Sequence, residues 1–262
     1  MRGERRPRSA APWVMRQTWW DLLFAHWPIE PSRLREVMPA ELPLDLYDGW
    51  AWIGVVPFTM TDVAPRGVPA VPWLSAFAEL NVRTYVSVGG RAGVYFLSLD
   101  AERLMAVAAA RVLFGLPYFH AQMSVRRDHY IEYQSRRRDG GAEFIAAYAP
   151  FGATFVAAPG TLDHFLTERY RLYTVNRGKV SSLEIRHPRW RLQPAWADIQ
   201  RNTMVEASGI VQPRTAPILH YSARQRMVGY WPVQVAEARR HAADAPGLVS
   251  AHLQDSARRS RG

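Results

Sequence analysis

Four polar side chains recur at every second position of one segment: Glu79, Asn81, Arg83 and Tyr85. Because successive side chains of a β-strand point to opposite faces, this spacing places all four on one face of a strand. A carboxyl group and a guanidinium on such a face suit proton transfer and anion binding. We therefore take these four residues, hereafter the polar row, as the centre of a candidate small-molecule site.

The polar row belongs to a predicted β-hairpin. Residues 78–88 alternate between polar and apolar side chains, and Gly89-Gly90 is a two-residue turn that admits positive φ. The return strand is predicted over 91–100. With this turn the numbers of paired residues sum to 179, so Glu79 should face Asp100. Two facing carboxylates raise the pKa of one of them, which suits a general acid or base.

The pattern of the return strand indicates whether the polar row is exposed to solvent. Its segment 94–97 (VYFL) is apolar on both faces, and such a strand is usually covered on both sides. The polar row would then lie under cover, where Arg83 and Glu79 can serve as each other's partners. The alternative is a solvated face with ordinary charges across the strand pair.

Short strands dominate the rest of the predicted structure. Ser32 is expected to cap a short helix that ends before Pro39, a second helix is expected over about 101–111, and Thr161 should cap a third that runs to about Tyr173. Further strands are predicted over 52–58, 117–127, 130–136, 143–148, 183–187, 202–206, 218–221 and 228–231.

The composition excludes several kinds of chemistry. Hydrophobic residues make up 48% of the 262 residues and charged residues 21%, as in a globular protein. The absence of cysteine excludes disulfides, thiolate metal sites and cysteine nucleophiles. The eight histidines form no HxH, HxxxH or HExxH pattern, so neither a metal nor a cofactor is predicted, although ligands from distant strands remain an alternative.

Half of the net charge of +10 lies at the two ends of the chain. Residues 1–9 carry a net charge of +3 and residues 252–262 a net charge of +2. We predict a flexible basic arm over 1–11, a single domain over 12–235 and an alanine- and arginine-rich tail over 236–262. No nucleic-acid motif accompanies the charge, so nucleic acid is an unlikely partner. No run of 18 apolar residues occurs, so no membrane span is expected and the expected location is the cytoplasm.

Six motifs, in order along the chain, resemble those of the YqjF-like family, a family with a domain of unknown function. They are 20–28 (WDLLFAHWP), 48–52 (DGWAW), 79–86 (ELNVRTYV), 93–96 (GVYF), 116–118 (LPY) and 167–173 (TERYRLY). The resemblance covers roughly residues 15–232. That family is distantly similar to acetoacetate decarboxylase, which implies a mostly-β, α+β fold: a closed antiparallel β-barrel or cone with a few flanking helices and an interior site.

The resemblance also implies roles for particular residues. Glu79 falls where the decarboxylase has an active-site glutamate, and residues 115–119 (GLPYF) resemble its Gly-Phe-Pro-Lys-Lys run. Both lysine positions are aromatic here, Tyr118 and Phe119, and neither can form a Schiff base. The one lysine of the chain, Lys179, is predicted to lie in a loop, so imine chemistry is not expected.

Three further residues are candidates for the pocket. His120 follows the decarboxylase-like turn and could act as an acid or base, or be a structural histidine. His26 lies in a family motif and could line the pocket or pack in the core. Arg169 is assigned to the pocket by the resemblance alone, and otherwise belongs to an amphipathic helix.

These observations predict a barrel that binds a small organic carbonyl or carboxylate compound. Glu79 or His120 would move a proton, and Arg83 would orient an anionic group. The ligand-binding residues would be Asn81, Arg83, Tyr85, Tyr118, His26 and Arg169. The alternatives are a non-catalytic ligand sensor or accessory protein on the same barrel, and nucleic-acid binding through the tails. Formation of a homo-oligomer is left open.

Overall fold

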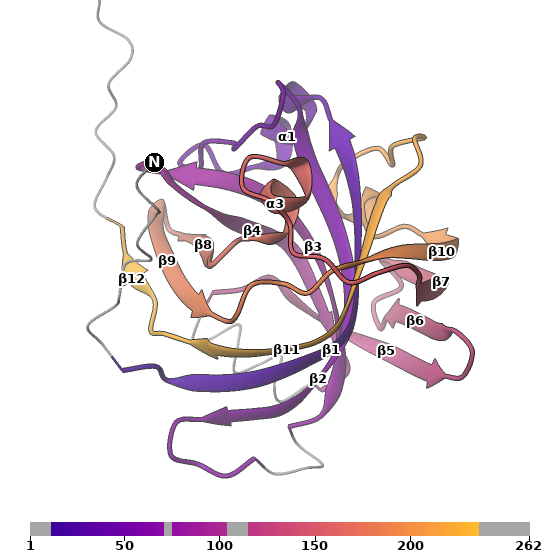
Figure 1. Ribbon diagram of the computed structural model, residues 1–262. Coiled ribbons are helices and arrows are strands. Elements are labelled where there is room, and N and C mark those ends of the chain that lie inside the picture. Colours follow the sequence, from indigo (N-terminus) through magenta and orange to yellow (C-terminus); the bar gives the residue numbers. More distant parts are fainter. Residues whose placement is uncertain (1–11, 71–74, 104–114, 236–262) are drawn as a thin grey trace, which may run out of the picture.

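The computed structural model describes residues 12–70, 75–103 and 115–235 (Figure 1). Most of the described chain is strand, as predicted. The strands are β1 Met15–Ile29, β2 Ala51–Pro65, β3 Phe77–Val88, β4 Arg91–Ala101, β5 Tyr118–Arg127, β6 Ile131–Arg137, β7 Glu143–Pro150, β8 Arg171–Asn176, β9 Lys179–Arg186, β10 Gln193–Asn202, β11 Ile218–Gly229 and β12 Val233–Gln234. The helices are α1 Pro31–Val37, α3 Leu162–Thr167 and the 3₁₀ turn η1 Glu206–Ser208.

Three predicted segments fall outside the described residues: the basic arm, the C-terminal tail and most of the helix expected over 101–111. Within the described part of the chain, no helix is both long enough and apolar enough to cross a membrane.

The strands close into two circuits that share one wall. One circuit has nine strands, in the order β4-β3-β2-β1-β11-β10-β7-β6-β5, and closes where β5 returns to β4. The other has seven, in the order β9-β8-β4-β3-β2-β1-β11, and closes where β9 pairs with β11. Pairing is antiparallel except at β4, which pairs in parallel with β5 and β8. In Figure 1, β5, β6, β7 and β10 lie on one side of the shared wall, and β8 and β9 on the other.

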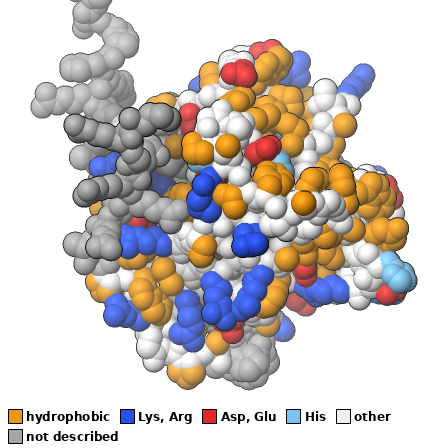
Figure 2. Space-filling model, viewed as in Figure 1, with side chains coloured by type: hydrophobic (Ala, Val, Ile, Leu, Met, Phe, Trp, Pro, Cys, Tyr) orange, Lys and Arg blue, Asp and Glu red, His pale blue; other side chains and the backbone are white. Residues whose placement is uncertain are grey.

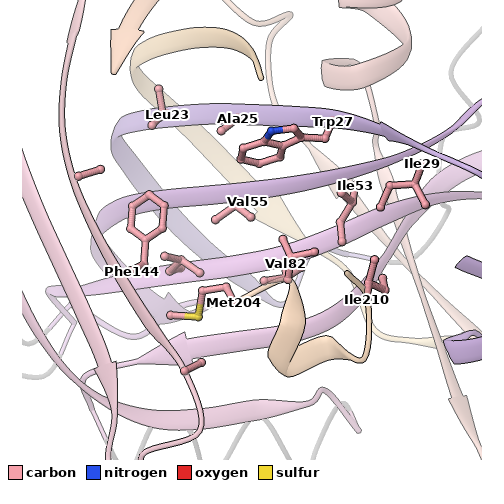
Figure 3. Packing of buried hydrophobic residues seen from close by; sticks show 14 of the residues in the cluster. Leu23, Ala25, Trp27, Ile29, Ile53, Val55, Val82, Phe144, Met204 and Ile210 are labelled. Atoms are coloured by element: carbon pink, nitrogen blue, oxygen red, sulfur yellow. The ribbon is translucent and has the colours of Figure 1, made fainter. Parts of the chain in front are cut away.

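The nine-strand circuit is filled by the main hydrophobic core (Figure 3). Leu23, Ile53, Val82 and Phe144 are fully buried there, and Met204 packs among them. Each fully buried side chain of this size contributes about 1.5–3 kcal/mol to folding. Because side chains alternate along each strand, the opposite face of the same shared wall must look into the seven-strand circuit.

The predicted hairpin forms, but its register changes part-way along. Near the Gly89-Gly90 turn the pairs are those expected, for example Arg83 with Phe96. A bulge at Leu97 then inserts one extra residue into β4, so Glu79 pairs with Ala101 rather than with Asp100. The predicted pair of facing carboxylates is therefore wrong, because a bulge shifts every pair beyond it by one position.

Two helix predictions also need correction. The first helix starts at Pro31 with Glu30 in the N-cap position rather than Ser32; proline suits the first turn, where its missing N–H is no loss. Thr161 does cap α3, since its hydroxyl accepts a hydrogen bond from the His164 amide at 3.3 Å. That helix ends at Thr167 rather than near residue 173, and β8 follows.

Several strands also differ from prediction. β1 was not predicted, and β2 continues to Pro65. β9 begins at Lys179, which was expected in a loop, and the two strands expected over 218–221 and 228–231 form the single strand β11.

A strand was expected over 202–206, but β10 ends at Asn202 and the chain then leads into η1. β10 itself, which begins at Gln193, was not predicted.

Arginine is prominent on the outer face of the seven-strand circuit. Arg16, Arg186 and Arg226 line an open depression of about 670 Å³, with Asp62 as its acidic member. Figure 2 shows Lys and Arg side chains spread over this face, above β9, β11 and β1. Part of the positive charge is therefore carried by the folded body as well as by the two ends of the chain.

Candidate functional site

The seven-strand circuit encloses a cavity of about 280 Å³. Apolar side chains of β1, β2, β3, β4, β8 and β9 form most of its wall. The polar residues that line it are Gln17, Glu79, Asn81, Arg83, Thr167, Arg169 and His187, together with the phenol of Tyr118. Three members of the polar row thus face the cavity, while the residues between them in β3, such as Leu80 and Val82, face the main core.

Glu79 is an isolated carboxyl group in an apolar wall. Its side chain is 4% exposed, and its Oε2 accepts a hydrogen bond from the Tyr118 hydroxyl at 2.8 Å. Burial raises the pKa of Glu79 to about 8, the Tyr118 hydrogen bond acts in the opposite direction, and Asp100 adds a smaller upward effect. At neutral pH Glu79 is therefore mostly protonated and can donate a proton.

The main cause of that raised pKa differs from the predicted one. Asp100 lies on the other face of the wall, where both of its carboxylate oxygens accept hydrogen bonds from Arg137 Nε at 2.9 and 3.0 Å. Burial of Glu79, rather than a facing carboxylate, is the largest influence on its proton.

Arg83 carries a charge that no carboxylate of the described residues neutralises. Its Nη2 donates to the Leu166 carbonyl at 3.3 Å, and its guanidinium carbon lies 5.2 Å from the ring centre of Phe24. The predicted pairing of Arg83 with Glu79 is not seen, since the carboxyl of Glu79 bonds to Tyr118 instead. Arginine keeps its proton under all ordinary conditions, so the cavity contains a fixed positive charge.

Tyr85 and His26 lie behind Arg83 and are not part of the cavity lining. Both are fully buried, and the Tyr85 hydroxyl bonds to His26 Nε2 and to the Leu166 carbonyl, each at 2.7 Å. Burial, followed by the nearby charges of Arg83 and His220, lowers the pKa of His26 well below its usual value. His26 is therefore neutral at physiological pH, and the pair supports the wall rather than contacting a ligand.

Gly54 makes the packing behind Arg83 feasible. A Cβ atom at this position would lie 2.8 Å from His26 Cδ2 and 3.5 Å from Arg83 Cγ. Carbon atoms do not approach to 2.8 Å without displacement, so only glycine lets the imidazole and the arginine stem lie against β2 at this level.

Arg169 lines the cavity, but its charge is already compensated. Its Nη1 bonds to Asp45 Oδ2 at 2.5 Å, its Nε donates to the Phe165 carbonyl at 2.7 Å, and its guanidinium stacks over the Phe165 ring. Arg83 is thus better placed than Arg169 to attract a ligand anion.

His120 is not among the residues that line the cavity. It lies two residues beyond Tyr118 in β5, is half-buried, and pairs through its backbone with Ala101 of β4. The structure therefore gives no contact that supports the predicted acid or base role of His120.

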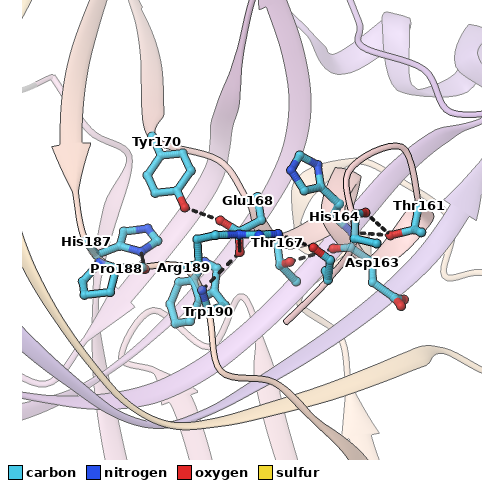
Figure 4. Close-up of polar contacts among 12 residues, drawn as sticks. Thr161, Asp163, His164, Thr167, Glu168, Tyr170, His187, Pro188, Arg189 and Trp190 are labelled. Carbon is cyan, nitrogen blue, oxygen red and sulfur yellow. Dashed lines mark hydrogen bonds and ion pairs between the residues drawn. The ribbon is translucent and has the colours of Figure 1, made fainter. Parts of the chain in front are cut away.

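Sequence reasoning missed an aromatic group at the cavity wall (Figure 4). The His187 ring lies 4.7 Å from that of Tyr170 and 4.8 Å from that of Trp190, measured between ring centres. Glu168 links this group, because its carboxylate accepts hydrogen bonds from the Tyr170 hydroxyl and, at 3.1 Å, from the Trp190 amide. These residues come from two separate connections, one on each side of the β8–β9 hairpin, and no sequence spacing relates them.

The described residues contain no cluster of three or more histidine, aspartate or glutamate side chains that could hold a metal ion. Among the described residues, the cavity lining supplies one buried carboxyl group, that of Glu79, and one guanidinium without a carboxylate partner, that of Arg83; most of the wall is apolar. Such a set can bind an organic anion and exchange a proton with it.

The two-circuit sheet places this protein in the acetoacetate decarboxylase-like class of folds. It is similar to the enduracididine biosynthesis enzyme MppR complexed with pyruvate (TM-score 0.61, 8% identity, 87% of this chain and 93% of that one). It is also similar to an acetoacetate decarboxylase (0.59, 12%, 89% and 92%) and to an acetoacetate decarboxylase-like enzyme from Sphingomonas wittichii RW1 (0.58, 12%, 90% and 98%). At these identities the likeness establishes the fold alone.

Sequence comparison gives a closer relationship. Residues 16–226 match the DUF2071 family, described as an uncharacterized conserved protein. The chain is 48% identical over 224 residues to the uncharacterized protein YqjF of Bacillus subtilis (strain 168), covering 85% of this chain and 92% of that protein. The chain therefore belongs to the DUF2071 family.

Proposed function

We propose that this protein binds a small organic carboxylate in the seven-strand circuit and exchanges a proton with it. The observation that carries the proposal is the guanidinium of Arg83: it faces an apolar cavity and has no carboxylate partner among the described residues. An uncompensated charge in such surroundings is costly, and an anionic ligand would remove that cost.

Glu79 supplies the proton in this proposal. With a pKa of about 8, it is mostly protonated at neutral pH and can transfer its proton to a carbonyl oxygen of the bound ligand. The carboxylate left behind would be stabilised by the Tyr118 hydroxyl, which already donates to it. The Glu79 carboxylate then removes a proton from the carbon next to that carbonyl, which gives the enol and restores the Glu79 acid. The acid exchanges its proton with solvent, and reversal of the two transfers returns a solvent proton to the carbon.

Imine chemistry has no support in this cavity. Tyr118 stands where the resemblance to the decarboxylase places a lysine, and it bonds to Glu79. Lys179 is exposed at the start of β9 and does not line the cavity. The similar enzyme MppR has been solved with pyruvate, a carboxylate with a neighbouring carbonyl, and this kind of ligand agrees with anion binding by Arg83.

The variant Arg83→Gln tests whether Arg83 binds the carboxylate of the ligand. The variant Arg226→Gln removes one positive charge from the outer face and serves as the control. Binding of a panel of oxo acids is measured by calorimetry and thermal shift. We expect Arg83→Gln to weaken binding at least ten-fold, since a charge-assisted hydrogen bond is lost, and Arg226→Gln to bind as the wild type does. Equal affinities in both variants would refute the proposed binding of the carboxylate by Arg83.

The proton transfer is tested by Glu79→Gln, which keeps the shape of the side chain but removes its acidity. Exchange of ligand protons with deuterium oxide, followed by NMR, should occur in the wild type and fall at least 100-fold in the variant. Ligand binding should remain. Binding without exchange in the wild type would instead identify a non-catalytic ligand sensor.

A further inference from the structure

The two functional groups of the cavity lie far apart along one strand. Glu79 and Arg83 are four residues apart on the same face of β3, and a strand rises about 3.3 Å per residue. Their Cα atoms are therefore separated by roughly 13 Å.

The two side-chain ends are bound by different neighbours. The Glu79 carboxyl is held by Tyr118 at the start of β5. The Arg83 guanidinium is held by the Leu166 carbonyl and lies 5.9 Å from the ring centre of Tyr85, the residue further along β3. Neither group forms an ion pair with the other, and Arg83 is not among the charges that shift the pKa of Glu79.

The cavity between the two groups is mainly apolar. In the shared wall, Asn81 stands midway and pairs with Val56 on one side and with Leu99 on the other; all three line the cavity. The whole cavity of about 280 Å³ equals the volume of about nine liquid waters at ~30 Å³ each. It therefore has room for a ligand on the order of ten non-hydrogen atoms.

Building on the proposed function, we infer that the ligand is an elongated oxo acid whose carbonyl group is remote from its carboxylate. The carboxylate binds Arg83, an apolar body of several carbon atoms lies over Asn81 and Val56, and the carbonyl reaches Glu79 and Tyr118. A 2-oxo acid as short as pyruvate has its two groups on adjacent carbons and can contact one end of the cavity only.

A series of unbranched acids tests this inference: pyruvate, 4-oxopentanoate, 6-oxoheptanoate and heptanoate. We expect affinity to rise at least ten-fold from pyruvate to 6-oxoheptanoate, and 6-oxoheptanoate to bind more tightly than heptanoate, which has the same chain but no carbonyl. The variant Glu79→Leu should abolish the difference in affinity between these last two acids.

A second variant blocks the middle of the cavity. Val56→Phe adds a ring next to Asn81, so it should weaken 6-oxoheptanoate at least ten-fold and pyruvate by less than two-fold. Circular dichroism and thermal denaturation establish that both variants are folded.

The outcomes separate this inference from the proposed function. If pyruvate binds as tightly as 6-oxoheptanoate, and binding depends on Arg83, the inference of an elongated ligand is refuted. The proposed binding of a carboxylate by Arg83 is then retained. If no acid of the series depends on Arg83, both are refuted.

Discussion

Two ionisable residues of one strand face respond to burial in opposite ways. Glu79 takes up a proton, because burial raises its pKa to about 8 and no cation of the described residues acts to lower it. Arg83 cannot lose its proton, so its charge persists within the wall. The same apolar surroundings thus produce a neutral acid and a fixed cation on one strand, and this difference is the chemical basis of the proposed site.

Glu79 should also make the stability of the protein depend on pH. The pKa of its carboxyl is about 8 in the folded protein and 4.5 without perturbation, so the folded state keeps a proton that the unfolded state releases above pH 4.5. The free energy of unfolding should therefore fall as the pH rises from about 4.5 to about 8, by about 1.4 kcal/mol for each unit of pKa difference, and level off above.

Denaturant unfolding of the wild type and of Glu79→Gln across this pH range checks the prediction. The variant lacks the titrating group, so the stability difference between the two proteins should shift in favour of the variant as the pH rises. A difference that stays constant between pH 5 and pH 9 would contradict a raised pKa.

At the scale of elements, the shared wall explains why the polar row is covered. Five strands, β1, β2, β3, β4 and β11, take part in both circuits, so each has one face toward the main core and the other toward the cavity. The apolar pattern of 94–97 correctly indicated cover on both sides. The bulge at Leu97 could not be anticipated, because an extra residue in a strand leaves the alternation of its partner unchanged.

A buried ion pair links β6 to β4 within the nine-strand circuit. Arg137 of β6 and Asp100 of β4 are almost fully buried, and Arg137 also lies over the Phe119 ring at 3.8 Å. Removal of one partner should leave a buried charge uncompensated, so Arg137→Met alone should lower the free energy of unfolding by about 3–5 kcal/mol.

The double variant Arg137→Met with Asp100→Leu supplies the control. Because it removes both charges, it should recover much of the lost stability. Chemical denaturation measures both variants, and a loss of less than about 1 kcal/mol in Arg137→Met would mean that the pair does not hold β6 to β4.

For the whole molecule, the scarcity of lysine makes imine chemistry easy to test. Lys179 is the one lysine of the chain and is exposed away from the cavity. Borohydride reduction in the presence of 6-oxoheptanoate or pyruvate should leave no adduct on this residue by mass spectrometry. Lys179→Gln serves as the control for labelling elsewhere, and a specific adduct on Lys179 in the wild type would contradict the prediction.

The sequence by itself determined the strand-rich fold, the diglycine hairpin and the face on which Glu79, Asn81 and Arg83 lie. These are consequences of local alternation and turn chemistry, and they act over a few neighbouring residues. The family motifs added the barrel, which the fold comparison confirms. The expectation that the protein does no imine chemistry stays a prediction.

Only the tertiary structure decided which of those polar groups contact the cavity and which stand behind it. His26 and Tyr85 support Arg83 from behind, Arg169 is paired with Asp45, and His187 reaches the wall from a distant connection. The physical reason is that partners and burial depend on how two strand circuits close around a shared wall, and the pairings that close them join residues far apart in sequence.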